Sequence, residues 1–343
     1  KSAFEGIGDA NNGFHSKTFE RFCNSLAQFH TRQEARYAGA SYPAASTLAG
    51  GRYSSAYGGV DTYSAEVMVP AFLQAYTGSG RGSLNLFPSL AHMLPNWSMR
   101  YSGLGKLPWF RDVFRSFNIN HAYQSIFSVG AYNSYATYMQ NETGLGFITD
   151  ATTGNPIPSS MFNISSVSLR ESFNPLLGID MTFNNNLTAK LEYRTTRTLN
   201  LSMTSVQINE ARSNDWVVGM GYRMNNFNLF GGGNHRVVKS RNHNNSSKAE
   251  PTKVVANHDL NLRLDLSYRR QAAISRDIRT VTSSASSGNT AFKLSFLADY
   301  TLSKLLTMSF YYDRQTNTPL LSSSSYPTTT DDFGLSIKFS LTR

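Results

Sequence analysis

The feature that most constrains this chain is a strict alternation of apolar and polar residues, clearest in DLNLRLDLSYRR at 259–270. Every even-numbered position from Leu260 to Tyr268 is apolar, and every odd-numbered position from Asp259 to Arg269 is polar or charged. Successive side chains of a β-strand point to opposite faces, so the segment predicts a strand with one apolar and one polar face. One strand alone does not say whether the apolar face meets a protein core or lipid.

The alternation recurs along most of the chain. It predicts about nine strands, near residues 96–103, 117–131, 163–183, 187–203, 216–224, 259–270, 292–302, 306–313 and 333–341. Pro175 indicates a bend or bulge in its strand, because proline cannot donate to the hydrogen-bond ladder. Arg197 falls on an apolar face, where a charge costs least at the edge of a membrane.

The composition favours the lipid alternative. Charged residues make up 16% of the chain and aromatic residues 13%, whereas a soluble protein usually carries about 25% charged residues. No run approaches the ~20 apolar residues of a transmembrane helix, so a chain of this kind that crosses a membrane must do so as a barrel. We therefore expect an all-β fold, an antiparallel transmembrane β-barrel with a few short helices in the N-terminal quarter and in turns.

The two faces of such a barrel have different surroundings, because the apolar face contacts lipid and the polar face lines the lumen. The residues predicted to face lipid are Leu260, Leu262, Leu264, Leu266, Phe292, Phe296, Phe333, Ile337 and Phe339. The residues predicted to face the lumen are Lys190, Glu192, Arg194, Arg223, Arg263, Asp265, Lys293 and Lys338.

The connections between the predicted strands alternate in length. The breaks at 184–186 and 303–304 are tight, whereas 273–290 and 314–331 are long and rich in Ser, Thr, Asn and Pro. Barrels have short periplasmic turns and longer outer loops, so the tight turns are expected on the periplasmic side. The basic segment 225–257 is an exception, because it is long, expected on the same side and expected to be poorly ordered.

Residues 1–90 differ from the strand-rich remainder, residues 91–343. They are expected to form an irregular periplasmic segment with short amphipathic helices. One helix is predicted from Ser16 to about Tyr37, where apolar residues recur at helical spacing.

Two further short helices are predicted. In VPAFLQAYTG, Pro70 suits the first helical position and Gly78 the position just past the end. The other lies near 106–115, at a turn on the periplasmic side.

The sequence contains little that points to catalysis. TGSGRGS at 77–83 lacks the preceding strand and the lysine of a phosphate-binding loop, so it is interpreted as a turn. The seven histidines show no metal-binding spacing, and His121 is interpreted as hydrogen-bonded or at an interface. Arg263 and Asp265 are interpreted as a structural charge pair. We expect no enzyme activity, no cofactor and no metal.

The net charge of +10 does not by itself indicate nucleic acid, because the basic residues are scattered along strands and loops. Lipopolysaccharide phosphates, a charged lumen or an acidic passenger suit this distribution at least as well. No nucleic-acid partner is expected.

Several stretches resemble a known family. They are VPAFLQAYTG at 69–78, PNWSMRYSGLGKLPWFRDVFRSFNINHAYQS at 95–125, SFNPLLGIDMTFNNNLTAKLEYRTTRTLNLS at 172–202, NDWVVGMGYRMNNFNL at 214–229 and FYYDRQTNTPLLSSSSYPTTTDDFGLSIKFSL at 310–341. In this order they resemble the C-terminal part of the SprA/Sov family, the outer-membrane translocon of the type IX secretion system. The resemblance is weakest over residues 1–60 and 231–257.

The resemblance implies properties that the pattern alone does not give. Members of the family are very long chains that close into one exceptionally large barrel, so this chain would be a C-terminal fragment. The family's pore exports folded cargo that carries a C-terminal signal domain, and the family is linked to gliding motility. A PorV-type barrel docks at a lateral opening, and a plug protein closes the periplasmic end. The family has no catalytic residues.

Three other interpretations stay open at this point. A self-contained outer-membrane porin or ligand transporter needs a further strand within residues 1–90. A soluble β-domain such as an adhesin needs no detergent. An outer-membrane enzyme needs acid and base residues that converge at one rim.

Overall fold

The structure is a computed structural model, and it describes residues 4–78, 84, 86, 95–225, 227, 258–303, 306–321 and 325–340. Antiparallel strands predominate, and most helical residues lie in the N-terminal part of the chain. The predicted β-rich antiparallel fold with a few helices is confirmed.

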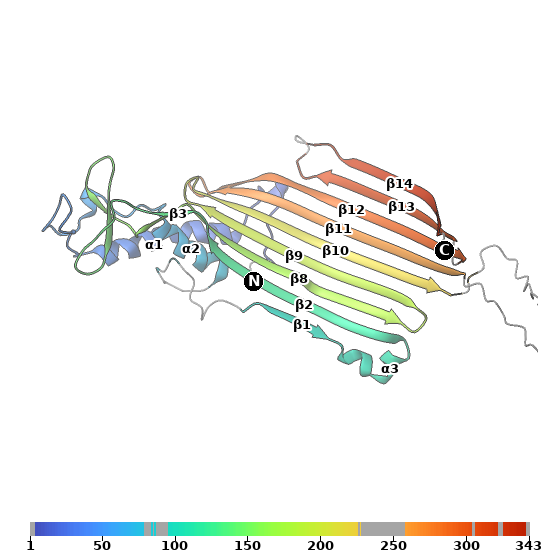
Figure 1. Ribbon diagram of the computed structural model, residues 1–343. Helices are drawn as coiled ribbons and strands as arrows, with labels where there is room; N and C mark the ends of the chain where they lie inside the picture. Colours follow the sequence, from blue (N-terminus) through green and yellow to red (C-terminus); the bar gives the residue numbers. More distant parts are fainter. Residues whose placement is uncertain are drawn as a thin grey trace, which may run out of the picture.

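Nine strands form one antiparallel sheet in which each strand pairs with the strands next to it in the order (Figure 1). They are β1 (Trp97–Tyr101), β2 (Phe114–Val129), β8 (Ser166–Phe183), β9 (Leu187–Ser202), β10 (Gln207–Met224), β11 (Asp259–Asp277), β12 (Thr282–Ser303), β13 (Leu306–Pro319) and β14 (Thr328–Phe339). Each corresponds to one predicted strand. Among the described residues the sheet does not close, because β1 and β14 each pair on one side only.

The prediction of two long loops, at 273–290 and 314–331, is wrong. β11 and β12 continue through the first of these ranges and meet in a turn at residues 278–281. The second is reduced to the connection between Pro319 and Thr328. The serine and threonine residues of these two ranges are typical of loops, but they also suit the polar face of a strand.

The remaining connections have mixed outcomes. The tight turn at 184–186 is confirmed, and Asn186 adopts the left-handed conformation that asparagine tolerates (φ 65°). Residue 304 of the 303–304 break and most of 225–257 lie outside the described residues. The register of β8 against β9 shifts between Phe173 and Leu177, which confirms the irregularity predicted at Pro175.

Two helices, α1 (Lys17–Tyr37) and α2 (Ala65–Thr77), dominate residues 4–78, which we call the N-terminal module. α1 begins after Ser16, whose hydroxyl accepts a hydrogen bond from the N–H of Phe19 (3.3 Å). The short helix α3 (Pro108–Arg111) lies near the predicted range 106–115, and Asn184 Nδ2 donates to the carbonyl of Arg111 (3.0 Å), so α3 shares the end of the sheet with the 184–186 turn. The described residues also include three 3-10 helices, Ala10–Asn12, Ser55–Tyr57 and Gly103–Lys106.

The predicted start of α2 at Pro70 is wrong, because the helix begins five residues earlier and contains the proline. Proline has no N–H, so the carbonyl of Glu66 loses its partner within the helix. Gln33 of α1, which is buried, supplies that partner through Nε2 (2.9 Å). The predicted end is correct, and Gly78 takes a left-handed conformation there (φ 69°).

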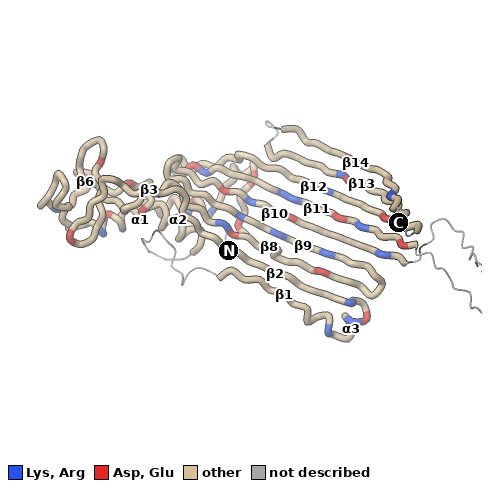
Figure 2. The backbone as a smooth tube through the Cα atoms, viewed as in Figure 1, with Lys and Arg blue, Asp and Glu red and all other residues tan. Residues whose placement is uncertain are grey.

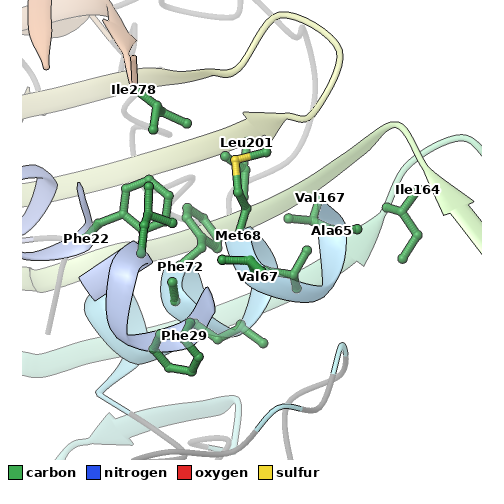
Figure 3. Close-up of a cluster of buried hydrophobic side chains, with 14 of the residues drawn as sticks. Phe22, Phe29, Ala65, Val67, Met68, Phe72, Ile164, Val167, Leu201 and Ile278 are labelled. Atoms are coloured by element: carbon green, nitrogen blue, oxygen red, sulfur yellow. The ribbon is translucent and has the colours of Figure 1, made fainter. Parts of the chain in front are cut away.

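The N-terminal module packs against the sheet to form the main hydrophobic core (Figure 3). Phe22 of α1 and Met68 of α2 are fully buried in the cluster that also contains Leu201 of β9. Ile278 belongs to the same cluster, so the core lies at the end of the sheet where β11 turns into β12. This is the end opposite the 184–186 turn. The N-terminal module and the 184–186 turn are both predicted on the periplasmic side, and these two predictions conflict because the module and the turn lie at opposite ends of the sheet.

Residues 130–165, between β2 and β8, form an excursion that the sequence did not reveal. It holds five short strands, β3 (Tyr132–Ser134), β4 (Met139–Gln140), β5 (Gly146–Thr149), β6 (Pro156–Pro158) and β7 (Phe162–Ile164). Phe147 is fully buried against Tyr37, and the Tyr37 hydroxyl donates to the carbonyl of Gly146 (3.0 Å). The excursion therefore contributes to the core of the N-terminal module.

We predict that Gln33→Met destabilises α2 by about 1–3 kcal/mol, because it leaves the carbonyl of Glu66 buried without a donor. Hydrogen exchange of the α2 amides measures this loss. Gln28→Met makes the same change at an exposed position of α1 and serves as the control. Equal protection of α2 in both variants would contradict the role given to Gln33.

Candidate functional site: the two faces of the sheet

One face of the large sheet is apolar and mostly uncovered. Helices α1 and α2 lie over one end of the sheet, and the strands continue well beyond them (Figure 1). Beyond the helices, Trp216 is 45% exposed, Met220 46% and Phe333 74%. Leu260, 262, 264 and 266 are half-exposed rather than part of a core.

The strand register brings the apolar positions of all these strands onto this one face. Met220, Leu264, Phe296, Tyr312 and Phe333 follow one another in register across β10 to β14. The nine residues predicted to face lipid all lie on this face. We call its uncovered part the apolar band.

The apolar band has a definite height. On β11 it extends from Leu260 to Tyr268, about 26 Å at a rise of about 3.3 Å per residue. A row of aromatic rings forms the border of the apolar band. Its members are neighbours in register, Tyr193, Trp216, Tyr268 and Phe292. The rings of Tyr193 and Trp216 stack with their centroids 4.4 Å apart. We call these four residues the aromatic row.

The opposite face is polar. Figure 2 shows acidic and basic residues interspersed along the strands of the sheet. The eight residues predicted to face the lumen all lie on it. Lys190 Nζ lies 2.8 Å from a carboxylate oxygen of Glu192, which Arg194 also contacts. Lys293 and Lys338 are exposed.

Further ion pairs occupy the polar face, among them Arg269 with Asp215 at 2.9 Å. Arg263 and Asp265 form the charge pair that the sequence predicted, with 2.6 Å between Nε and Oδ2. Arg223 pairs with Asp259 of the adjacent strand at 2.8 Å. Three of the side chains in these last two pairs are well exposed and Asp259 is 15% exposed, so the pairs keep the face hydrated and the Arg263–Asp265 pair contributes little to stability.

A cluster of buried charges interrupts the apolar face near the N-terminal module. Arg197 and Arg276 flank Glu210, with Nε to carboxylate-oxygen distances of 2.8 and 2.9 Å, and all three are at most 1% exposed. Glu5 lies 3.7 Å from Arg197. We call these four residues the charge cluster.

The charge cluster corrects the interpretation of Arg197. This arginine lies on the apolar face, as predicted, but protein covers it and Glu210 neutralises it. The rings of Tyr76 and Phe19 lie beneath the guanidinium groups of Arg197 and Arg276. Sequence reasoning missed Glu210 and Arg276, although both break the alternation on the apolar face of neighbouring strands.

The charge cluster also holds the N-terminal residues 4–16, which we call the strap. Arg276 donates to the carbonyls of Phe14 (2.6 Å) and Ile7 (3.1 Å). The ring of Phe4 packs on Phe173 of β8 at 5.0 Å. The strap therefore crosses the apolar face from β8 to β11.

Groups that could perform chemistry are few among the described residues. His121 Nδ1 is hydrogen-bonded to the carbonyl of Leu176 (2.6 Å), as predicted for a structural histidine. Burial raises the pKa of the Cys23 thiol to about 12, which does not suit a nucleophile. Most of 77–83 lies outside the described residues. The described residues hold no group of three or more His, Cys, Asp or Glu side chains suited to a metal.

No model of a known protein family matches this chain, and no curated protein matches its sequence. In the described part of the chain, every helix is too short or too polar to cross a membrane. The geometry of the two faces therefore carries the functional argument.

We predict that Glu210→Gln weakens docking of the N-terminal module by about 3–5 kcal/mol, because it leaves two arginines buried with too little compensating charge. Hydrogen exchange of the α1 amides measures the effect. Asp265→Asn removes a carboxylate from an exposed pair and should cost at most about 1 kcal/mol. Similar small effects of both variants would show that the charge cluster does not hold the module.

Proposed function

We propose that this chain forms part of the wall of an outer-membrane protein-conducting channel, with the apolar band toward lipid and the polar face toward a water-filled passage. The single observation that carries the proposal is the uncovered apolar band. Across the seven strands β8 to β14, about 4.8 Å apart, it spans roughly 29 Å and is shortened on β13 and β14 by the Arg314–Asp331 ion pair, so its area is on the order of 700 Å². Soluble monomers rarely expose apolar patches above a few hundred Å².

The height of the apolar band supports lipid as its partner. The hydrophobic belt of an outer-membrane barrel is about 25 Å tall and is bordered by aromatic girdles. The apolar band on β11 has about this height, and the aromatic row borders it on the side of the N-terminal module. The strands, of up to 22 residues, are longer than the about 10 residues that a membrane needs, so the sheet extends past the membrane on that side.

The two open edges support a large barrel rather than a complete small one. Within lipid, every backbone N–H and C=O needs a partner, and an unpaired strand edge is excluded. β1 and β14 both lack a second neighbour among the described residues. In the proposed assembly, further strands pair with both edges and close the barrel.

The resemblance of the stretches at 69–78, 95–125, 172–202, 214–229 and 310–341 to the SprA/Sov family supports a proposed role in the type IX secretion translocon. In this proposal folded cargo with a C-terminal signal domain passes along the polar face. A PorV-type barrel and a periplasmic plug protein are the partners, and gliding motility depends on the same export. The mixed, paired charges of the polar face keep it hydrated, and a hydrated wall does not retain a passing protein.

We predict that Lys293→Leu with Lys338→Leu reduces export of folded cargo severalfold in the native host. Neither lysine has an ion-pair partner among the described residues, so the change leaves no carboxylate unpaired. Secreted cargo is measured against the amount of the protein in the outer membrane.

The matched control is Lys17→Leu with Arg52→Leu, which removes the same charge from exposed positions of the N-terminal module. Export that is unchanged in the first variant, or reduced equally in both, would contradict a role of the polar face in conduction.

A further inference from the structure

A cavity of about 400 Å³ lies on the apolar side of the sheet, between the strap and strands β10 and β11. Arg212 and Asn214 line it from β10, Arg270 from β11, and Phe4 and Ile7 from the strap. We call it the strap cavity.

The strap cavity lies directly beyond the aromatic row. In the register, Trp216 pairs with Tyr268, the next residues on this face are Asn214 and Arg270, and Arg212 follows. The face thus changes within two residues from aromatic to basic. The site of this change, at the end of the apolar band, is where lipid headgroups lie in the proposed function.

The two arginines of the strap cavity lack anionic partners. Arg270 is exposed and has no hydrogen bond or ion pair to any described residue. Arg212 donates through Nη1 to the carbonyl of Glu5, but its Nε is buried and has no partner in the described part of the chain.

The other groups around the strap cavity do not neutralise these arginines. The Asp9 carboxylate is the acidic group in the lining, and it accepts hydrogen bonds from the N–H groups of Asn11 (3.0 Å) and Asn12 (3.1 Å). Neither arginine forms an ion pair with it. The charge cluster lies next to the cavity, where Glu210 is already shared by two other arginines.

We propose that the strap cavity binds the phosphate group of an anionic membrane lipid, and this inference rests on the proposed function. Guanidinium groups recognise phosphate oxygens through paired hydrogen bonds, and two of them face one cavity here. The apolar side chains of Phe4 and Ile7 suit the less polar part of a headgroup. The bound lipid would connect the strap to the membrane surface.

The test uses the closed assembly that contains this chain, placed in lipid nanodiscs, and native mass spectrometry of the lipids that stay bound after release. The probes are a phosphorylated lipid A-type glycolipid, its dephosphorylated form with the same acyl chains, and phosphatidylglycerol. We expect the phosphorylated lipids to be retained about tenfold better than the dephosphorylated one. This ratio corresponds to about one additional charge-assisted hydrogen bond between the phosphate and an arginine. Whichever of the two phosphorylated lipids is retained better then identifies the leaflet of the membrane that the strap cavity faces.

Arg270→Gln should abolish this preference and leave the fold intact, because Arg270 has no partner to lose. Arg100→Gln removes an exposed arginine on β1, outside the cavity, and should keep the preference. Arg212→Lys retains the charge without the planar pair of donors and should weaken the preference.

Two results would overturn the inference. One is equal retention of the dephosphorylated glycolipid, and the other is displacement of bound lipid by an equal concentration of inorganic phosphate. A chain that inserts into nanodiscs without any phosphate preference contradicts this inference alone. A chain that stays soluble without lipid or detergent contradicts the proposed function itself.

Discussion

The register of the nine-stranded sheet is the constraint on which the rest of the structure depends. Side chains alternate between faces with a period of two, so a slip of one residue between any two strands would mix the apolar and polar faces. The observed pairing avoids this along the apolar band, where Leu264 is flanked by Met220 and Phe296 while Asp265 is flanked by Gly219 and Ser295. One-residue shifts occur only outside the middle of the strands, at Ala273/Ile274, Phe114/Ser116 and Thr301/Ser303 of the described pairs. Two chemically distinct surfaces result from one ladder.

The charge cluster marks where the uncovered part of the apolar face ends. Beyond the aromatic row, the face carries Arg197, Glu210 and Arg276, which protein must cover because lipid or bare apolar surface cannot compensate their charges. The N-terminal module supplies that cover together with its own apolar residues, such as Phe22 and Phe72. The face therefore has two zones, one buried by protein and one proposed to be buried by lipid.

Alternation predicts the nine strands and which of the two faces each of the seventeen residues named above occupies, because it is a local property of the sequence. Connection lengths were not predictable in the same way, since the Ser and Thr residues of 282–290 suit a loop or a polar strand face equally. The partners of Arg197 lie outside its own strand, Glu210 on β10 and Glu5 in the strap, so neither could be assigned to it from the sequence. The same holds for Gln33, whose role depends on how α1 packs on Pro70.

The most direct test of the central claim compares neighbouring positions of β11 in a membrane. Leu264→Cys and Arg263→Cys are made in a Cys23→Ser background, which removes the single native thiol. Outer-membrane vesicles that hold the chain in its closed assembly are treated with a water-soluble maleimide that does not enter lipid, and labelling at residues 263 and 264 is read by mass spectrometry. The account predicts labelling of Cys at 263 and protection at 264, with protection lost when detergent or denaturant removes the lipid. Equal labelling of both positions in intact vesicles would contradict it.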